Sequence, residues 1–475
     1  MRIRPHTVEI VVLAGLTGAL AYAVIQRAGI DPQDWNLCLL FIGVTVGIYG
    51  ALASVGDIPK LDRLSSSCVL TVLGLAAFQL IPLPIGIVRV LSPMRFELGE
   101  SASRLMIGYH TQTLTLTAMP YETAEYLLTL SGYSLVVLFI RHLTLKLRDA
   151  AWLVIWPLLA VSGLEAALGC YQAYAYPGAG GARGTYQNRD HFAGLLEMAV
   201  PLALSCAIAS FQSHYRLRDS SSRPPIKGCV AISIFALLLA GVIQSLCRVA
   251  FVTSLAAIFV VLATVFATRN WHDGPLANIR EWPRWMPVTA VAAVVVLCFM
   301  YLQTNALAAR FADLPGKGSI SADTRAQIWR DTTRLVRDYP IFGCGLGSYG
   351  SCFLRYKIVA PEGTVDYAHN DYLQVLAEFG VFGFAVGLFF IIRILRRTVQ
   401  AALYADSADK RLLAIGCLGA ATAILLHSFV DFNMYVPANG FEFAWILGVA
   451  AISSSGSLNH SEPLVESSPL AFGTA

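Results

Sequence analysis

Residues 368–393 read AHNDYLQVLAEFGVFGFAVGLFFIIR. A short polar segment, His369 to Asp371, leads directly into a long apolar run. Apolar or small residues recur at helical spacing, so a helix is expected to start near Asn370 or Asp371; these residues are Leu373, Leu376, Ala377 and Gly380. The apolar run has about the 20 residues that cross a bilayer. The stretch therefore predicts a membrane-spanning helix with polar groups in its first turn.

The composition of the whole chain agrees with a membrane protein. Hydrophobic residues make up 56% of the chain and charged residues 13%, whereas roughly 25% of the residues in a soluble domain are charged. The net charge of +4 is small, and basic residues at the ends of apolar segments account for it. We therefore expect an all-α integral membrane protein that contacts the lipid bilayer and binds no nucleic acid.

Apolar segments of roughly 20 residues, the length that spans a bilayer, recur along the chain. We expect about twelve spans, with the limits 8–26, 36–55, 67–89, 126–142, 151–171, 191–211, 228–246, 249–268, 286–303, 374–393, 411–430 and 440–455. Only Ser245 to Arg248 separates the seventh span from the eighth, where one long buried helix is the alternative. No small-residue cleavage site follows the first apolar segment, so we expect it to be retained as an anchor.

These spans define one polytopic membrane domain over residues 1–455, followed by a polar tail, 456–475, that we expect to be disordered and cytoplasmic. Basic residues concentrate in the loops on the side of the N-terminus. By the positive-inside rule, both termini are then cytoplasmic, and two long loops, 90–125 and 304–373, face outward.

With this topology the unusual polar residues fall at the outer surface. They are Arg183, Asn188, His191, Arg248, Arg325, His369 and Asp431. A transporter would instead be expected to hold ionisable residues near the membrane midplane, where only Glu165 and Glu197 are candidates. The distribution favours a reactive site at the membrane surface.

His369 is a candidate for the reactive group. Asn370 or Asp371 can cap the helix that follows it. His369 then lies at the positive end of the helix dipole, which disfavours the imidazolium form. A neutral imidazole at the membrane surface suits a general base. The alternative, an interfacial polar residue that leads into a span, stays open because lone histidines are common.

Residues 325–338 predict a surface helix that ends at Tyr339-Pro340. One face of this helix is apolar or neutral and carries Ile328, Thr332, Leu335 and Val336. Another face is basic and carries Arg330, Arg334 and Arg337. A guanidinium group can donate to two phosphate oxygens at once, which suits phosphate binding. A solvated face is the alternative for the helix, and a side chain that reaches the interface is the alternative for the isolated Arg248.

Three further features of the outer loops remain ambiguous. The glycines at 343–350 lack the strand and helix of a dinucleotide-binding loop, so we expect a flexible turn there. Cys344 and Cys352 share this loop and could form a disulfide, which their spacing alone does not establish. The segment 184–191 is either a capped helix start or a part of the same site.

Five stretches carry a likeness to one family: 183–201, 245–248, 325–350, 369–383 and 427–432. The chain resembles the O-antigen ligase and polymerase family of bacterial membrane glycosyltransferases over roughly residues 150–450. The most specific part is His369 followed by Leu373, Glu378, Gly380 and Gly383. One departure is the Cys247-Arg248 pair, which stands where the family has a Ser-Arg-like pair.

The resemblance implies a helical bundle related to the GT-C glycosyltransferases in a bacterial inner membrane, with its site in the periplasm. It implies transfer of a glycan from an undecaprenyl diphosphate donor, with inversion and with no cofactor or metal. His369 would be the catalytic base, and Arg248 and Arg325 would hold the diphosphate. We expect the remaining substrate contacts at Arg183, Asn188, His191, Arg330, Asn370, Asp371 and Asp431.

The acceptor stays open at this stage. A ligase would use lipid A–core, a polymerase a growing polysaccharide, and a protein-glycosylating relative a side-chain hydroxyl. Outer loops read acceptors, and the 90–125 loop is a candidate surface. A membrane transporter and a scaffold of a polysaccharide export complex are the alternatives from other classes.

Overall fold

The computed structural model describes residues 7–53, 59–105, 112–177, 180–216, 226–268, 322–358 and 364–451. Within these residues the chain is almost entirely helical, which confirms the expected all-α fold. The exceptions are the two-stranded antiparallel sheet of β1 (Leu83–Pro84) and β2 (Thr113–Leu114) and the connecting turns. The predictions for the span 286–303, for the loop 304–321 and for the tail 456–475 concern residues outside this description.

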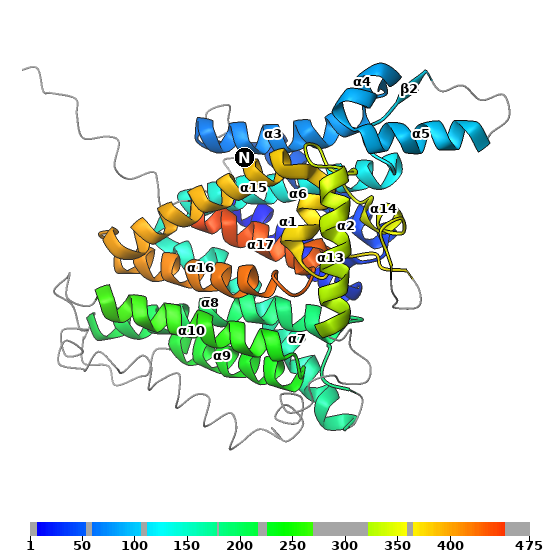
Figure 1. Ribbon diagram of the computed structural model, residues 1–475. Coiled ribbons are helices and arrows are strands. Elements are labelled where there is room, and N and C mark those ends of the chain that lie inside the picture. The colour runs from blue at the N-terminus through cyan, green and yellow to red at the C-terminus, as the bar shows by residue number, and fades with distance from the viewer. Residues whose placement is uncertain are drawn as a thin grey trace, which may run out of the picture.

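Nine helices of the described residues are long and apolar enough to cross a membrane. They are α1 (Thr7–Ile25), α2 (Pro32–Leu52), α3 (Arg63–Leu80), α6 (Pro120–Lys146), α8 (Arg189–Arg216), α9 (Ile226–Gln244), α10 (Arg248–Thr268), α15 (Asp371–Tyr404) and α16 (Ala408–His427). Figure 1 shows α8, α9, α10, α15 and α16 running alongside one another. Each of the nine corresponds to an expected span, so the chain is a multi-pass membrane protein.

Three expected spans differ from the structure. α3 ends at Leu80 rather than at 89, since Pro82 and Pro84 cannot donate the N–H groups that a continued helix needs. The fifth expected span is α7 (Trp156–Ala175), which is not among the nine apolar helices of the described chain. The last is α17 (Pro437–Ala450), whose 14 residues are typical of a buried core helix rather than of a span.

Short elements complete the described chain. α4 (Ile85–Leu91) and α5 (Pro93–Leu105) project from the bundle beside β2 (Figure 1). Three 3₁₀ turns connect longer helices: η1 (Arg27–Gly29), η3 (Arg148–Val154) and η6 (Asn433–Tyr435).

The boundary between α9 and α10 is a true break, so the alternative of one long helix is wrong. Leu246 has a φ of 60°, in the left-handed region. The Ser245 hydroxyl donates to the Val242 carbonyl at 2.6 Å and accepts from the Cys247 N–H at 3.1 Å. These bonds satisfy backbone groups that the break exposes, and Arg248 becomes the first residue of α10.

α8 is the most enclosed of the nine apolar helices in the described residues. Of its apolar window, 89% is buried, because α9, α10 and α16 pack around it. Polar side chains on such a helix lose their contact with water and must be paired inside the protein. His191 and Glu197 are in this position, with exposed fractions of 3% and 0%.

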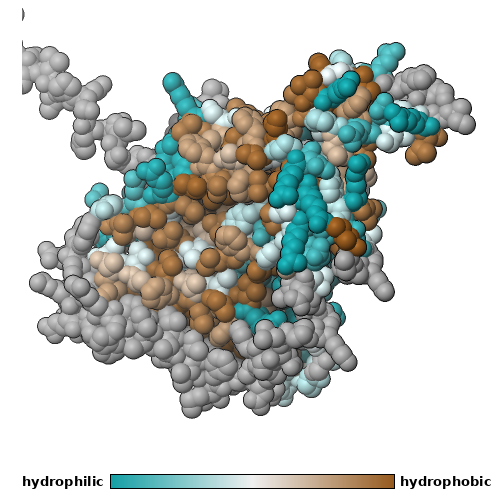
Figure 2. Space-filling view, viewed as in Figure 1, coloured by the Kyte–Doolittle hydropathy of each residue, from teal (hydrophilic) through white to brown (hydrophobic). Residues whose placement is uncertain are grey.

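α13 (Ala322–Asp338) runs across one end of the bundle (Figure 1). The predicted two faces are confirmed, because Ile328 and Leu335 are buried while the three arginines of the basic face are exposed. Figure 2 shows hydrophilic side chains gathered at this end and hydrophobic ones over the bundle beside it. The indole N–H of Trp329 donates to the Ala368 carbonyl at 3.0 Å and so anchors the helix to the residue before His369.

The glycine-rich turn packs tightly against a break in α15. Within α15, Gly380 has a φ of 66°, and the Cys344 and Gly345 N–H groups donate to the Ala377 and Glu378 carbonyls at 2.9 and 3.2 Å. A Cβ atom at Gly343 would lie 2.2 Å from the Glu378 carbonyl. The turn is therefore fixed rather than flexible, and its glycines allow this close approach.

The possible disulfide between Cys344 and Cys352 is not present in this structure. Cys344, on the glycine-rich turn, and Cys352, on the short helix α14 (Tyr349–Phe353), are free thiols, and both are buried. Burial raises the pKa of the Cys344 thiol well above its ordinary value. The pair behaves as small core residues, as buried thiols usually do.

Candidate functional site

Asp431 lies at the centre of a cluster of three histidines. Its Oδ1 is 3.3 Å from Nδ1 of His369, and its Oδ2 is 3.7 Å from Nε2 of His191 and 4.0 Å from Nε2 of His427. The histidines belong to the segment before α15, the first turn of α8 and the last residue of α16. Segments far apart in the sequence therefore meet at one carboxylate.

Asp431 is ionised in this setting. Its exposed fraction is 3%, and burial by itself would raise the pKa of the carboxyl group. The neighbouring imidazoles of His191, His369 and His427 outweigh burial, so the pKa of Asp431 lies well below the ordinary value. A buried carboxylate of this kind can stabilise positive charge on an imidazole beside it.

The backbone on both sides of His369 is held in place. The Ala368 N–H donates to Oε1 of Gln374 at 2.6 Å, and Oδ1 of Asn370 accepts from the Leu373 N–H at 3.0 Å, which confirms the predicted cap of α15. His369 itself has a φ of 49°, a left-handed conformation that is unusual without a glycine. Such a residue costs roughly 1–3 kcal/mol, so its surroundings must enforce it.

The ring of His369 directs one of its two nitrogens at Asp431. Its side chain is 16% exposed and turns Nδ1 towards Asp431. If Nδ1 carries the proton and donates to the carboxylate, Nε2 keeps the lone pair that a general base requires. The Phe432 ring meets the imidazoles of His369 and His191 edge-on, with ring centres 4.9 and 4.6 Å apart, and it stacks on Tyr367 at 4.1 Å.

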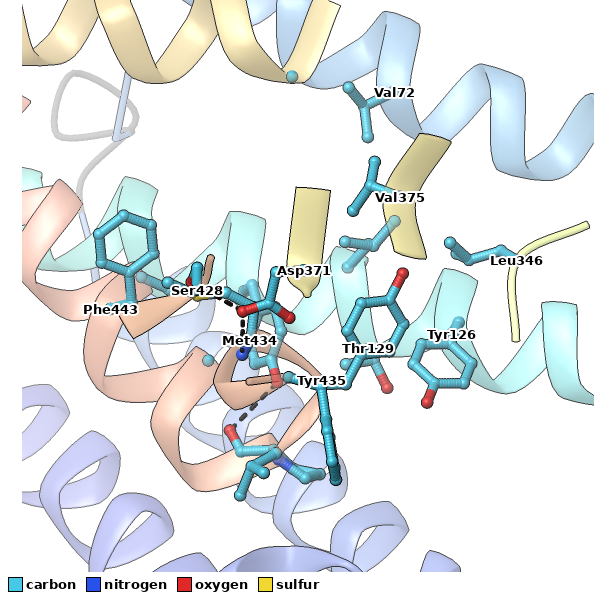
Figure 3. Close-up of a pocket in the computed structure, with 18 of the residues that line it drawn as sticks. Val72, Tyr126, Thr129, Leu346, Asp371, Val375, Ser428, Met434, Tyr435 and Phe443 are labelled. Atoms are coloured by element: carbon cyan, nitrogen blue, oxygen red, sulfur yellow. Dashed lines mark hydrogen bonds between the residues drawn. The ribbon is translucent and has the colours of Figure 1, made fainter. Parts of the chain in front are cut away.

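A cavity of about 780 Å³ opens beside the cluster. Its lining includes the polar side chains of Asn188, His191 and Asp371, and most of its other lining residues are apolar side chains of α3, α6, α15 and α17. In Figure 3, Asp371 is bonded to Ser428 and Met434, and Val72 and Val375 are drawn among the apolar residues of the same cavity. Such a lining suits a hydrocarbon chain with a polar group at one end.

Two polar side chains of the cavity wall have unused hydrogen-bonding capacity. Both ring nitrogens of His191 are buried and make no hydrogen bond with the described residues. Oδ1 of Asp371 is in the same state, although its Oδ2 accepts from the Ser428 hydroxyl at 2.7 Å. Buried polar atoms without a partner are costly, so a bound polar ligand would satisfy them.

Asn188, Asn370 and Asp431 bond mainly to the protein itself. Oδ1 of Asn188 accepts from the Asp190 N–H at 2.9 Å at the start of α8, and the Asn370 amide donates to the Phe429 carbonyl at 2.9 Å. The geometry therefore favours a supporting role for Asn370 and Asp431 over a direct substrate contact, while Asn188, His191 and Asp371 line the cavity.

The candidate arginines lie on elements next to the cluster or on the surface. Arg248 follows Cys247, whose thiol contacts His427. Arg325 precedes Trp329 by one turn of α13, and its buried Nε has no partner among the described residues. Arg183 and Arg330 are exposed, and neither side chain bonds to the histidine cluster in the described part of the chain.

Several buried polar residues in and around the cluster were not predicted from the sequence. His427 lies four positions before Asp431, a spacing that places both on one side of a helical turn, but its role was not assigned. Glu197 was noticed only as a carboxylate at depth. Glu378 and Glu442 were not recognised as buried, although both have exposed fractions of 1% or less. Glu378 accepts from the Tyr435 hydroxyl at 2.8 Å and from the Tyr349 N–H at 3.2 Å.

The fold and the cluster define a multi-pass helical membrane protein with a histidine–carboxylate site beside an apolar cavity. Residues 233–388, about a third of the chain, match the family model described as O-antigen ligase. The match supports an O-antigen ligase or polymerase-like family and confirms the resemblance. It includes Arg248, Arg325 and His369. Among curated proteins, none matches the chain. The family supports glycan transfer of the O-antigen ligase type, by an enzyme in a membrane.

Proposed function

We propose that this protein transfers a glycan from an undecaprenyl-diphosphate donor to an acceptor hydroxyl at the periplasmic face of the inner membrane. The observation that carries the proposal is the pairing of His369 with Asp431 at 3.3 Å. The same carboxylate faces His191, which lines the apolar cavity. The cavity would take the polyprenyl chain, and His369 would meet the acceptor near its polar end.

In the proposed reaction, Nε2 of His369 takes the proton of the acceptor hydroxyl as the acceptor oxygen attacks the anomeric carbon. The bond from that carbon to the diphosphate oxygen breaks, its electron pair stays on the diphosphate, and the configuration inverts. Asp431 stabilises the imidazolium that forms, as a carboxylate does beside a catalytic histidine.

Arg248 and Arg325 would hold the diphosphate and stabilise the charge that develops as it leaves. The buried, unpartnered Nε of Arg325 supports this role, because a phosphate oxygen would supply the missing acceptor. With two guanidinium groups in this role, the proposed reaction requires no metal ion, and chelator should leave the rate unchanged.

The decisive test uses the purified protein with a lipid-diphosphate-linked glycan and a candidate acceptor. His369→Ala should lower the transfer rate by at least about 10²-fold, the usual contribution of a general base. Arg325→Ala should also lower it, whereas Arg337→Ala, on the exposed face of the same helix, should not. Full transfer by folded His369→Ala protein would contradict the assignment.

The same assay identifies the acceptor. We propose lipid A–core or a growing polysaccharide, with a protein hydroxyl as the second candidate, because the O-antigen ligase description of the matched family points to polysaccharide substrates. Product chains on lipid A–core indicate a ligase, longer lipid-linked chains a polymerase, and glycosylated peptide a protein transferase. We also propose that both termini are cytoplasmic, as the basic loops predict.

A further inference from the structure

A buried ion pair continues the histidine cluster away from the cavity. Nδ1 of His427 lies 2.9 Å from Oε1 of Glu197, and their side chains are 1% and 0% exposed. Oε2 of Glu197 accepts from the Thr253 hydroxyl at 2.5 Å. The pair therefore joins α8, α10 and α16 at the place where these helices are packed together.

Carboxylate and imidazole groups alternate from the protein interior to the candidate site. Glu197 faces His427, His427 faces Asp431 across 4.0 Å, and Asp431 faces His369 across 3.3 Å. A buried carboxylate is costly unless a positive group compensates it. Because Glu197 engages Nδ1 of His427, the other nitrogen of that ring is directed at Asp431.

We propose that Glu197 and His427 are positioning residues, which hold the Asp431 carboxylate in place against the imidazole of His369. Asp431 belongs to a loop, where the Phe432 N–H donates to its Oδ1 at 3.0 Å and the other carboxylate oxygen faces His191 and His427. His427 is fixed by Glu197 and by the end of α16, and it supplies a rigid partner on the far side of Asp431. The inference rests on the proposed transferase function, since it assigns the pair to the same site.

Glu197→Gln tests the proposal with little change of shape. The amide can still accept from Thr253, but the negative charge that orients His427 is lost. We expect kcat to fall on the order of tenfold or more, as for outer partners of metal-bound histidines. KM for donor and acceptor should stay within about twofold, because no group that contacts substrate changes. Glu165→Gln is the matched control: it alters another buried glutamate, on α7, which bonds to Thr185 rather than to the histidine cluster, and it should keep wild-type kcat.

A double-mutant cycle shows whether Glu197 acts through Asp431. In an Asp431→Asn background, Glu197→Gln should cause no further loss of kcat, because residues that act as one unit are not additive. An additional loss equal to that in the wild-type background would overturn the proposal. The Glu197→Gln protein could fail to fold because it leaves His427 buried without its partner. In that case the double variant Glu197→Gln, His427→Gln is used, since it removes both charges and leaves no unpaired ion.

The outcomes separate this inference from the function on which it rests. Wild-type activity that needs His369 but not Glu197 would overturn the positioning role alone, as would a change confined to KM. Failure of both the single and the paired variant to fold would assign the pair to structure only. A wild-type protein inactive with every acceptor would overturn the transferase proposal and this inference together.

Discussion

His369 lies at the boundary between water and the protein interior, whereas its partner Asp431 is buried. The side chain of His369 is 16% exposed and that of Asp431 only 4%. A charge interaction with a buried partner is screened less by water and salt than one at the surface. The carboxylate can therefore stabilise an imidazolium strongly, and in the proposed reaction Nε2 of the partly exposed ring meets the acceptor.

Asp431→Asn tests this electrostatic role at the residue scale. The substitution keeps the shape of the side chain but removes its negative charge, so an imidazolium at His369 becomes less stable. We expect a lower rate, and we expect the acidic limb of the pH–rate profile to move to lower pH. Transfer measured over a series of pH values checks both effects. A profile identical to that of the wild type would show that Asp431 does not act on the base.

The same residue makes a contribution to stability that depends on pH. Its pKa is depressed in the folded protein, so its stabilising effect is present above the pKa of an unfolded aspartate and is lost as the pH falls through the folded value. Asp431→Asn should reduce the loss of thermal stability on acidification. This comparison uses the folded protein alone and needs no substrate.

At the scale of elements, the start of α15 and the break at Gly380 fix the segment that contains His369. The cap at Asn370 sets the first turn of α15. At the break, N–H groups of the glycine-rich turn donate to the carbonyls of Ala377 and Glu378. Gln79 of α3 adds a third support, because its amide donates to the Glu378 carbonyl at 2.9 Å. The first half of α15 is therefore held at both ends.

Gly343→Ala should weaken this support. The new Cβ atom would lie 2.2 Å from the Glu378 carbonyl at a φ of 72°, and both strain and overpacking of this kind cost about 1–3 kcal/mol. We expect a lower midpoint of thermal unfolding in detergent. Gly74→Ala is the control, since that helical position on α3 has open space and alanine favours a helix. Equal stability of the two variants would contradict the close approach at Gly343.

At the scale of the whole molecule, the enclosed helix α8 links the cavity to the buried ion pair. His191 in its first turn lines the cavity, and Glu197 further along bonds to His427. The helix α8 therefore belongs both to the cavity wall and to the group of helices that buries the ion pair. In the proposed reaction, the lipid of the donor and the base His369 would be positioned by the same packed core.

Gly387→Leu tests whether the cavity holds the lipid of the donor. Gly387 lines the cavity, and a Cβ atom there meets nothing within 4 Å, so the first atom of a larger side chain has room. We expect KM to rise for a donor with a full-length polyprenyl chain and to change little for a short-chain donor. Gly47→Leu on α2, also in open space but outside the cavity lining, is the control. Equal effects on both donors would contradict the assignment.

The sequence by itself determined the elements whose signals are local. Nine of the expected spans, the two faces of α13 and the cap at Asn370 follow from periodicity, composition and capping chemistry, which act over a few neighbouring residues. The expected topology also places His369 and Asp431 on one surface. The end of α3 and the length of α17 differ from the prediction, because prolines and burial rather than hydropathy set those limits.

Only the tertiary structure decided which polar groups meet. His191, His369, His427 and Asp431 come from three parts of the chain, and their distances depend on how α8, α15 and α16 pack. The buried pair of Glu197 and His427 is separated by 230 positions. No local pattern encodes such a pairing, because it results from helix packing. Packing excludes water, and a buried charge is then costly unless an opposite charge lies beside it.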